Sequence, residues 1–184
     1  MTTEHSTQSR RTSRCATTPL MAEPILKLSI PRSRSRTTAE GASFPFGAHI
    51  AVAEVDVETG EARLVRHVAV DDCGTVINPL LVEGQQHGGI GSGIGQALYE
   101  EVRFDGDGNP ITSNFADYGL PSAAEMPSFE VHSTVTPSPN NPLGAKGIGE
   151  AATIGSTPAI QNAVIDAVSH LGVLHIDMPC TPQR

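Results

Sequence analysis

Two neighbouring runs, residues 48–57 and 61–70, are rich in apolar and β-branched side chains and are typical of β-strands. They flank the polar turn 58–60, which ends in glycine, so the pattern predicts a β-hairpin. Residues 129–135 form another strand-like run, and a short one lies near 174–176. The chain therefore contains several predicted strands separated by segments of a different period.

A second, smaller hairpin is predicted around the Asp- and Gly-rich segment 105–110. Residues 102–104 and 111–112 flank it as two short apolar runs. The acidic residues lack the spaced ligands and the closing Glu of an EF-hand calcium loop. We therefore interpret this segment as a turn.

Helical periodicity appears near the C-terminus. Ser156 is a favourable N-cap residue and Pro158 suits a first helical turn, where its missing N–H has no cost. Gly172 predicts the end of the helix. Between these signals, apolar residues recur at spacings of three and four: Ala159, Ile160, Ala163, Val164, Ala167, Val168 and Leu171.

A glycine-rich stretch, residues 82–100, combines two conflicting signals. It holds six glycines between Gly84 and Gly95, and each disfavours an isolated helix by roughly 1 kcal/mol relative to Ala. Ile90, Ile94 and Leu98 nevertheless keep helical spacing. A helix packed very close to another backbone or to a flat ligand accounts for both signals, and a flexible linker is the alternative.

A second glycine-rich run, residues 143–152, precedes the C-terminal helix and contains one lysine and one glutamate. Glycine allows close approach of a backbone to a ligand, and amides ahead of a helix favour an anion. The spacing fits neither a P-loop nor the GxGxxG dinucleotide fingerprint. Glu150 at the end of the run is placed to act as a base, and a tight surface turn with a solvated carboxylate is the plainer reading.

The first 43 residues differ in composition from the remainder, residues 44–184. Residues 1–42 hold seven Lys or Arg and three acids, whereas the rest holds five and seventeen. This part is rich in Ser, Thr and Arg without a periodic apolar face, which predicts a disordered tail. A nucleic-acid-binding arm, a transit peptide and residual sequence from a truncated reading frame all remain open, and the last is favoured over a nucleic-acid role.

Composition excludes several classes of protein. Three cysteines without a spacing pattern form neither a disulfide framework nor a zinc site, and they suit a reducing cytoplasm. Histidines show no paired metal spacing, so no protein-bound metal ion is predicted. No apolar run approaches the length of a membrane span. The predicted strands and helices after residue 43 indicate an α+β domain.

The residues from Phe44 to the C-terminus resemble the molybdopterin-binding large subunit of the xanthine dehydrogenase / aldehyde oxidase family. Within that family they are most similar to the aerobic carbon monoxide dehydrogenase branch. The resemblance implies a fragment of the molybdenum-binding domain of a molybdenum hydroxylase. It is carried, in the family's order, by FPFGAHIAVAEVDVETGE, VAVDDCGTVINPLLVEGQQHGGIGSGIGQALYEE, DYGLPSAAEMPSFE, TPSPNNPLGAKGIGEAATIGSTPAIQNAVIDA and HIDMPCTP.

The resemblance also implies roles for individual residues. Glu150 closes the family's GxKGxGE loop and matches the active-site base, which takes a proton from a hydroxo ligand of molybdenum. Two stretches match cofactor-contacting segments. Their residues are Thr75, Val76, Ile77, Asn78, Pro79, Leu80, Leu81 and Gln85 in the first, and Lys146, Gly147, Ile148 and Gly149 in the second.

The implied cofactor is molybdenum bound to molybdopterin cytosine dinucleotide. The implied partners are an iron–sulfur small subunit and an FAD-binding medium subunit. The N-terminal half of the cofactor cradle and the cysteine loop of carbon monoxide dehydrogenases have no counterpart here, and Cys73 and Cys180 match no such motif. Two hypotheses follow: an oxidoreductase fragment that works when a complementing chain supplies the rest, acting on CO, an aldehyde or an N-heterocycle, or a non-catalytic remnant.

Overall fold

The computed structural model describes residues 41–184, which begin with a long β-hairpin. Strand β1 (Phe46–Val55) pairs antiparallel with β2 (Ala62–Asp72), and the register shifts once between Val52 and Ala53. Asp56 shapes the turn, because its carboxylate accepts from the amides of Glu58 at 2.8 Å and Thr59 at 3.2 Å. The predicted hairpin is confirmed. The predicted tail, residues 1–43, lies almost wholly outside the described residues.

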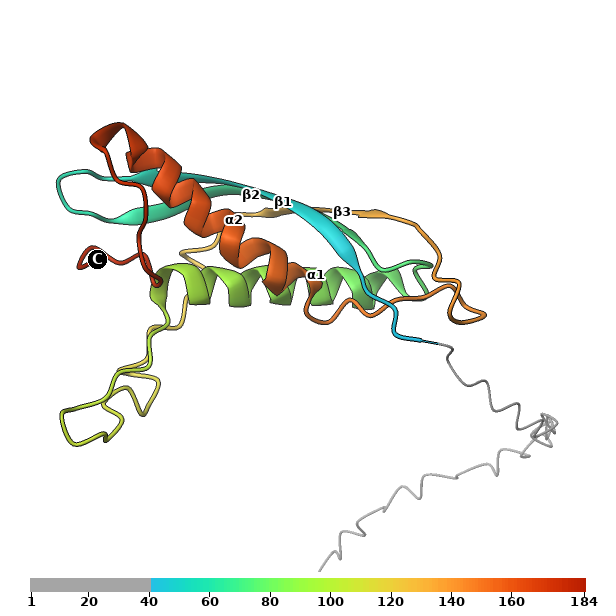
Figure 1. Ribbon diagram of the computed structural model, residues 1–184, viewed down its shortest axis with the longest axis horizontal. Coiled ribbons are helices and arrows are strands. Elements are labelled where there is room, and N and C mark those ends of the chain that lie inside the picture. The colour runs from blue at the N-terminus through green and yellow to red at the C-terminus, as the bar shows by residue number, and fades with distance from the viewer. Residues whose placement is uncertain (1–40) are drawn as a thin grey trace, which may run out of the picture. The chain divides into compact units, whose positions relative to one another are not determined.

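Strand β3 (Phe129–Thr134) completes a three-stranded sheet in the order β1-β2-β3 (Figure 1). It pairs with β2 in the parallel direction, from His67 opposite Phe129 to Asp72 opposite Thr134. The strand predicted at 129–135 is confirmed. The parallel pairing is not visible in the sequence, because it joins segments separated by residues 73–128.

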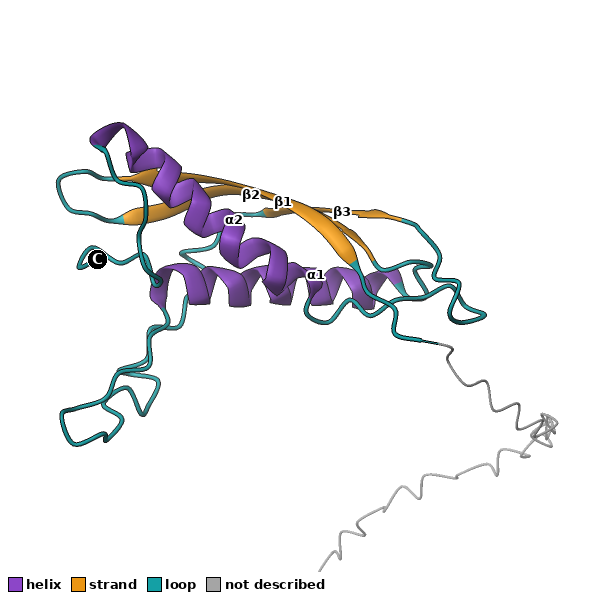
Figure 2. Ribbon diagram, in the orientation of Figure 1, coloured by secondary structure: helices purple, strands orange, loops and turns teal. Residues whose placement is uncertain are grey.

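Helix α1 (Pro79–Ile94) forms from the glycine-rich stretch and continues into one π-helical turn, Gly95–Tyr99 (Figure 2). Asn78 caps its start by accepting from the Leu81 amide at 3.3 Å. A side chain at Gly89 would lie 2.7 Å from the Ala152 Cβ, and one at Gly93 would overlap Ser156. The prediction of a helix packed closely against another backbone is therefore confirmed.

Helix α2 (Ala151–Val168) begins five residues before Ser156, so the predicted N-cap is wrong. Ser156 instead lies buried inside the helix, where its small side chain packs against Gly93. Pro158 also lies in the interior. Contact with α1 therefore prevails over the local capping signals. The predicted stop is placed correctly, since Gly172 (φ 86°) caps the 3₁₀ turn Ser169–Leu171 that follows α2.

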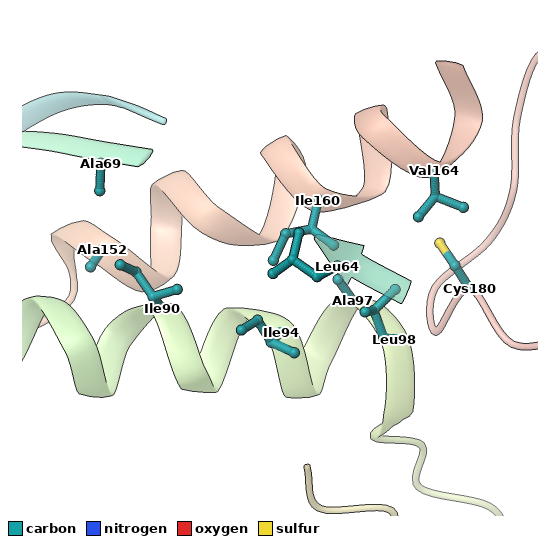
Figure 3. Close-up of a cluster of buried hydrophobic side chains, with 10 residues drawn as sticks. All are labelled: Leu64, Ala69, Ile90, Ile94, Ala97, Leu98, Ala152, Ile160, Val164 and Cys180. Atoms are coloured by element: carbon teal, nitrogen blue, oxygen red, sulfur yellow. The ribbon is translucent and has the colours of Figure 1, made fainter. Parts of the chain in front are cut away.

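The hydrophobic core lies between the sheet and the two helices (Figure 3). Leu64 and Ala69 enter it from β2, while the other elements supply aliphatic side chains and the C-terminal segment supplies Cys180. The buried members from the helical segments are Ile90, Ile94, Ala97, Leu98, Ala152, Ile160 and Val164. The core fixes α2 against α1 and β2, and hence fixes the loop that leads into α2.

Two predicted elements do not form. Residues 102–112 make a turn closed by a single bridge between Phe104 and Pro110, without the two strands of a hairpin. Asp105 accounts for this, because its carboxylate accepts from the amides of Asp107 and Asn109 and organises the turn locally. Residues 174–176 are not a strand, and the Ile176 carbonyl accepts from the Gln161 side chain instead.

Candidate functional site

The glycine-rich loop before α2 is bound to the end of β2 by main-chain contacts. The amide of Lys146 donates to the Cys73 carbonyl at 2.7 Å, and the amide of Thr75 donates to the Gly144 carbonyl at 2.9 Å. Gly74 (φ 69°) and Gly144 (φ 67°) both have left-handed backbones, which glycine adopts without strain. The two stretches predicted to contact a cofactor are thus neighbours in space.

A pocket of about 230 Å³ lies where these stretches meet. Seven predicted cofactor residues line it: Thr75, Ile77, Asn78, Leu81, Gln85, Lys146 and Ile148. Its other lining residues, Cys73, Val82 and Ala145, were not predicted, although Val82 and Ala145 each lie beside a predicted residue and Cys73 lies two positions from Thr75. The remaining predicted residues, Val76, Pro79, Leu80, Gly147 and Gly149, do not line it.

Two of the predicted cofactor residues have a clear structural task at the start of α1. Asn78 is the N-cap residue, and Pro79 occupies the first turn. Gln85 and Gln86 are neighbours in sequence with opposite environments, since Gln86 is buried and Gln85 is exposed on the pocket side. Gln85 also approaches the loop, because a side chain at Gly149 would lie 3.7 Å from its Oε1.

The tip of the loop, from Gly147 to Gly149, is open. A side chain at Gly147 would meet nothing within 4 Å. Among residues 41–184, no backbone–backbone hydrogen bond uses the amides of Gly147, Ile148 or Gly149 as donors. Successive amides of this kind, just ahead of a helix, suit an anionic or polar edge of a ligand.

Glu150 occupies the N-cap position of α2 without capping it. Its side chain makes no hydrogen bond to the first turn and is exposed. A carboxylate at a helix N-terminus is stabilised by the helix dipole. It does not line the pocket, although it follows directly on the loop that does. The carboxylate is thus open to solvent and has no hydrogen bond to the first turn of the helix.

The side chain of Lys146 turns towards the end of β2. Its Nζ lies 3.0 Å from Asp72 Oδ1 and 4.5 Å from the centre of the Phe46 ring. Asp72 also accepts from the Gly74 amide, and these bonds to the charged form outweigh burial, which alone would raise its pKa. The net effect is that the pKa of Asp72 is well below its usual range.

A buried polar network lies beneath the sheet, next to the start of α2. His49 contacts Asp71 (Nε2 to Oδ1, 3.2 Å) and His67 (Nδ1 to Nε2, 3.1 Å), and Gln86 donates to Asp71 at 3.0 Å. The Asp71 carboxylate only accepts, so His49 donates to it from Nε2. The remaining His67 nitrogen is buried without a partner in the described part of the chain. No sequence motif signalled this network.

Burial, and to a smaller extent the neighbouring His49, lower the pKa of the His67 imidazole to about 4. Burial also raises the pKa of the Cys73 thiol, so that this pocket residue stays protonated near neutral pH. Within residues 41–184, no three His, Cys, Asp or Glu side chains are arranged to hold a metal ion. No helix in the same range is long and apolar enough to cross a membrane.

These features fit part of a large cofactor with an anionic group. The fit consists of open amides at the loop tip, glycines where side chains would intrude, and polar side chains of Thr75 and Gln85 beside the pocket. The pocket is much smaller than a dinucleotide cofactor requires, since drug-sized ligands already occupy roughly 300–1,000 Å³. The pocket is therefore large enough for only part of such a cofactor.

Comparison with known sequences gives a consistent result. The profile of the family described as molybdopterin cofactor-binding domain matches residues 11–127. The carbon monoxide dehydrogenase large chain of Hydrogenophaga pseudoflava is 46% identical over 142 residues, which are 77% of this chain and 18% of that protein. The nicotine 6-hydroxylase large subunit of Paenarthrobacter nicotinovorans is 40% identical over 141 residues, with coverage of 77% and 17%.

Comparison with solved structures agrees. CO dehydrogenase from Oligotropha carboxidovorans superposes with a TM-score of 0.74 at 45% identity, over 77% of this chain and 18% of that one. The chain thus spans less than a fifth of the length of the relatives that it matches. The profile match begins inside the predicted tail, so the boundary at residue 43 stays a prediction.

Proposed function

Because this chain belongs to the family of molybdopterin cofactor-binding domains found in molybdenum hydroxylases, we propose that it contributes part of the active site of such an oxidoreductase. The observation that carries the proposal is the meeting of residues 73–85 with the glycine-rich loop around one pocket. Glu150 follows directly with an exposed carboxylate. Residues 44–184 form the contributing domain.

In this proposal the glycine-rich loop binds the cofactor and Glu150 accepts a proton. A bound molybdenum–molybdopterin cofactor supplies two-electron redox chemistry at this pocket. The amides of Gly147 to Gly149 and the side chains of Thr75 and Gln85 would hold the polar part of the cofactor. Ile77, Leu81 and Ile148 exclude water from one side. Glu150 accepts a proton from a group held next to the loop, as a general base.

The cofactor form, substrate and partners belong to this proposal as well. We infer a dinucleotide form of the cofactor, because a pyrophosphate suits the anion-favouring amides of the loop tip, and the resemblance implies cytosine as its base. The segment does not distinguish among CO, aldehydes and N-heterocycles, since relatives named for CO and for nicotine match it over the same length. An iron–sulfur small subunit, an FAD-binding medium subunit and a complementing large-subunit segment are the proposed partners, in the cytoplasm.

A non-catalytic remnant is the second candidate. It is favoured by the exposed apolar side chains at the start of α1, where Ile77, Leu80 and Leu81 are each more than half exposed. In an intact site such side chains would be covered. An isolated wall that exposes them binds a large cofactor weakly, because the entropy of binding is not offset by partial contacts.

Coexpression decides between the two. This chain is produced together with the complementing segments of a related large subunit, and the purified complex is analysed for molybdenum and for released cytosine nucleotide. Stoichiometric amounts of both support the proposal. A stable complex that contains neither supports the remnant.

A further inference from the structure

The ammonium group of Lys146 is buried and already paired. Its side chain is 8% exposed and that of its partner Asp72 is fully buried, with 3.0 Å between the charged atoms. The ring of Phe46 covers the same ammonium group. A charge held in this way is neutralised within the protein, so it adds little positive potential to the adjacent pocket.

Asp72 joins three separate segments of the chain. Its Oδ1 accepts from the Gly74 amide at 2.9 Å as well as from Lys146, and its Oδ2 accepts from the Thr134 hydroxyl at 3.0 Å. The carboxylate therefore links the turn after β2, the end of β3 and the glycine-rich loop. Removing one partner would leave a buried charge uncompensated, which is strongly unfavourable.

Residue 146 is fixed through both its main chain and its side chain. Its amide bonds to the Cys73 carbonyl at 2.7 Å while its ammonium group bonds to Asp72. The next three residues make no such backbone bonds as donors within the described part of the chain. The loop thus has an anchored root at Lys146 and an open tip that leads to Glu150.

From this geometry we propose that Lys146 and Asp72 are a positioning pair that holds the root of the loop against the end of β2 and thereby positions Glu150, and that Lys146 does not contact the cofactor through its charge. The inference rests on the proposed function for the identity of what the loop serves. It replaces the role that the resemblance implied for Lys146. The anionic edge of the cofactor is then recognised by the loop amides.

The first test uses this chain alone and hydrogen exchange followed residue by residue. Lys146→Met removes the charge and keeps a long apolar side chain. We expect at least about tenfold faster exchange of the amides of residue 146 and Thr75, the equivalent of about 1.4 kcal/mol of local stability, while Ile94 and Ile160 in the core change less. Lys146→Arg, which keeps the charge, restores most of the protection.

A matched control removes an exposed charge instead. Arg66 pairs with Glu130 on the sheet surface, with more than half of the Arg66 side chain exposed. Arg66→Met should leave exchange of the loop amides unchanged. Equal acceleration of loop and core amides in Lys146→Met, or no acceleration, would overturn the positioning role. If Lys146→Met fails to fold, Asp72→Asn replaces it. The exchange rates of its loop and core amides are then compared with those of Lys146→Arg.

A second test separates this inference from the proposed function. In the completed subunit, Lys146→Arg should lose less molybdenum and less turnover than Lys146→Met, because the pair survives. Loss of the cofactor in Lys146→Arg with intact loop protection would show a direct contact and overturn the inference. Faster loop exchange in Lys146→Met, together with no molybdenum in any complex, would support the pair and reject the proposed function.

Discussion

At the scale of single residues, Glu150 and Lys146 lie four positions apart on one loop and have opposite environments. Glu150 is exposed at the start of α2, whereas Lys146 is buried against Asp72. The exposed residue can be changed without loss of a buried contact, and the buried one cannot. Substitutions at these two positions can therefore separate the effect on proton transfer from the effect on the structure of the loop.

Glu150→Gln tests the chemistry. In a completed subunit the variant should keep its cofactor and lose the base, and general-base catalysis contributes about 10²–10⁴-fold in rate. Turnover with a dye acceptor should fall by that order while molybdenum content, measured on the same samples, stays constant. Full activity would show that Glu150 is not the base. Loss of the metal would show that its role is structural.

His67 gives the chain a defined pH dependence. Its pKa is about 4 in the folded protein and 6.5 is the ordinary value, so between these pH values the unfolded chain binds the proton more readily. The contribution of neutral His67 to the free energy of unfolding is therefore complete above about pH 6.5, and it is lost as the pH falls to about 4. The loss is on the order of 3 kcal/mol at 1.36 kcal/mol per pH unit.

Urea unfolding between pH 7.5 and 4.5 measures this effect. His67→Gln keeps a side chain that can hydrogen-bond His49 Nδ1 and removes the titration, so its free energy of unfolding should vary less over the same range. The carboxylate of Asp72 has a lowered pKa and affects stability only below about pH 4. An identical pH slope in both proteins would contradict the assignment to His67.

At the scale of elements, the contact between α1 and α2 depends on small residues. Gly93→Ala would place a Cβ against Ser156 and 3.1 Å from the Thr157 amide nitrogen, so it should destabilise the fold by about 1–3 kcal/mol. Gly84→Ala is the matched control on the same helix, because a side chain there meets nothing within 4 Å. It should stabilise by roughly 0.5–1 kcal/mol through helix propensity. If Gly93→Ala and Gly84→Ala changed the free energy of unfolding equally in chemical denaturation, the close packing of α1 on α2 would be contradicted.

The same elements show what the sequence can predict. The hairpin and α1 follow from local signals, namely a glycine turn between apolar runs and an apolar period that persists through six glycines. The start of α2 does not follow from local signals, because the favourable capping chemistry of Ser156 is outweighed by its contact with Gly93. The partner of Lys146 is also hidden, since Asp72 lies on a distant strand and reaches the loop only through the fold.

At the scale of the whole molecule, the proposed function makes residues 41–184 only one part of a larger site. Residues 73–85 and the glycine-rich loop form one wall, and apolar side chains beside it are exposed, among them Ile77, Leu80 and Leu81. We expect the chain purified alone to hold no molybdenum and to oxidise no substrate, as judged by metal analysis and dye reduction. We also expect it to self-associate in light scattering. Stoichiometric cofactor in the isolated chain would contradict this prediction.

Limited proteolysis tests the boundary of the domain. The composition of residues 1–43 predicts that they bury too little apolar surface to offset the entropy of ordering. A protease should therefore trim the chain to near Phe44 and leave a resistant product, identified by mass spectrometry. Protection of the Arg-rich segment in the free protein would contradict the prediction.

The parallel pairing of β3 with β2 has a consequence for the order of folding. β1 and β2 are contiguous in the sequence, so the hairpin can form as soon as it leaves the ribosome, whereas β3 must first close the long connection of residues 73–128. Thr134 and Lys146 reach Asp72 only after that closure. We therefore expect the pocket residues around the glycine-rich loop to come together late in folding. The Asp72 carboxylate is by then in place at the end of the hairpin.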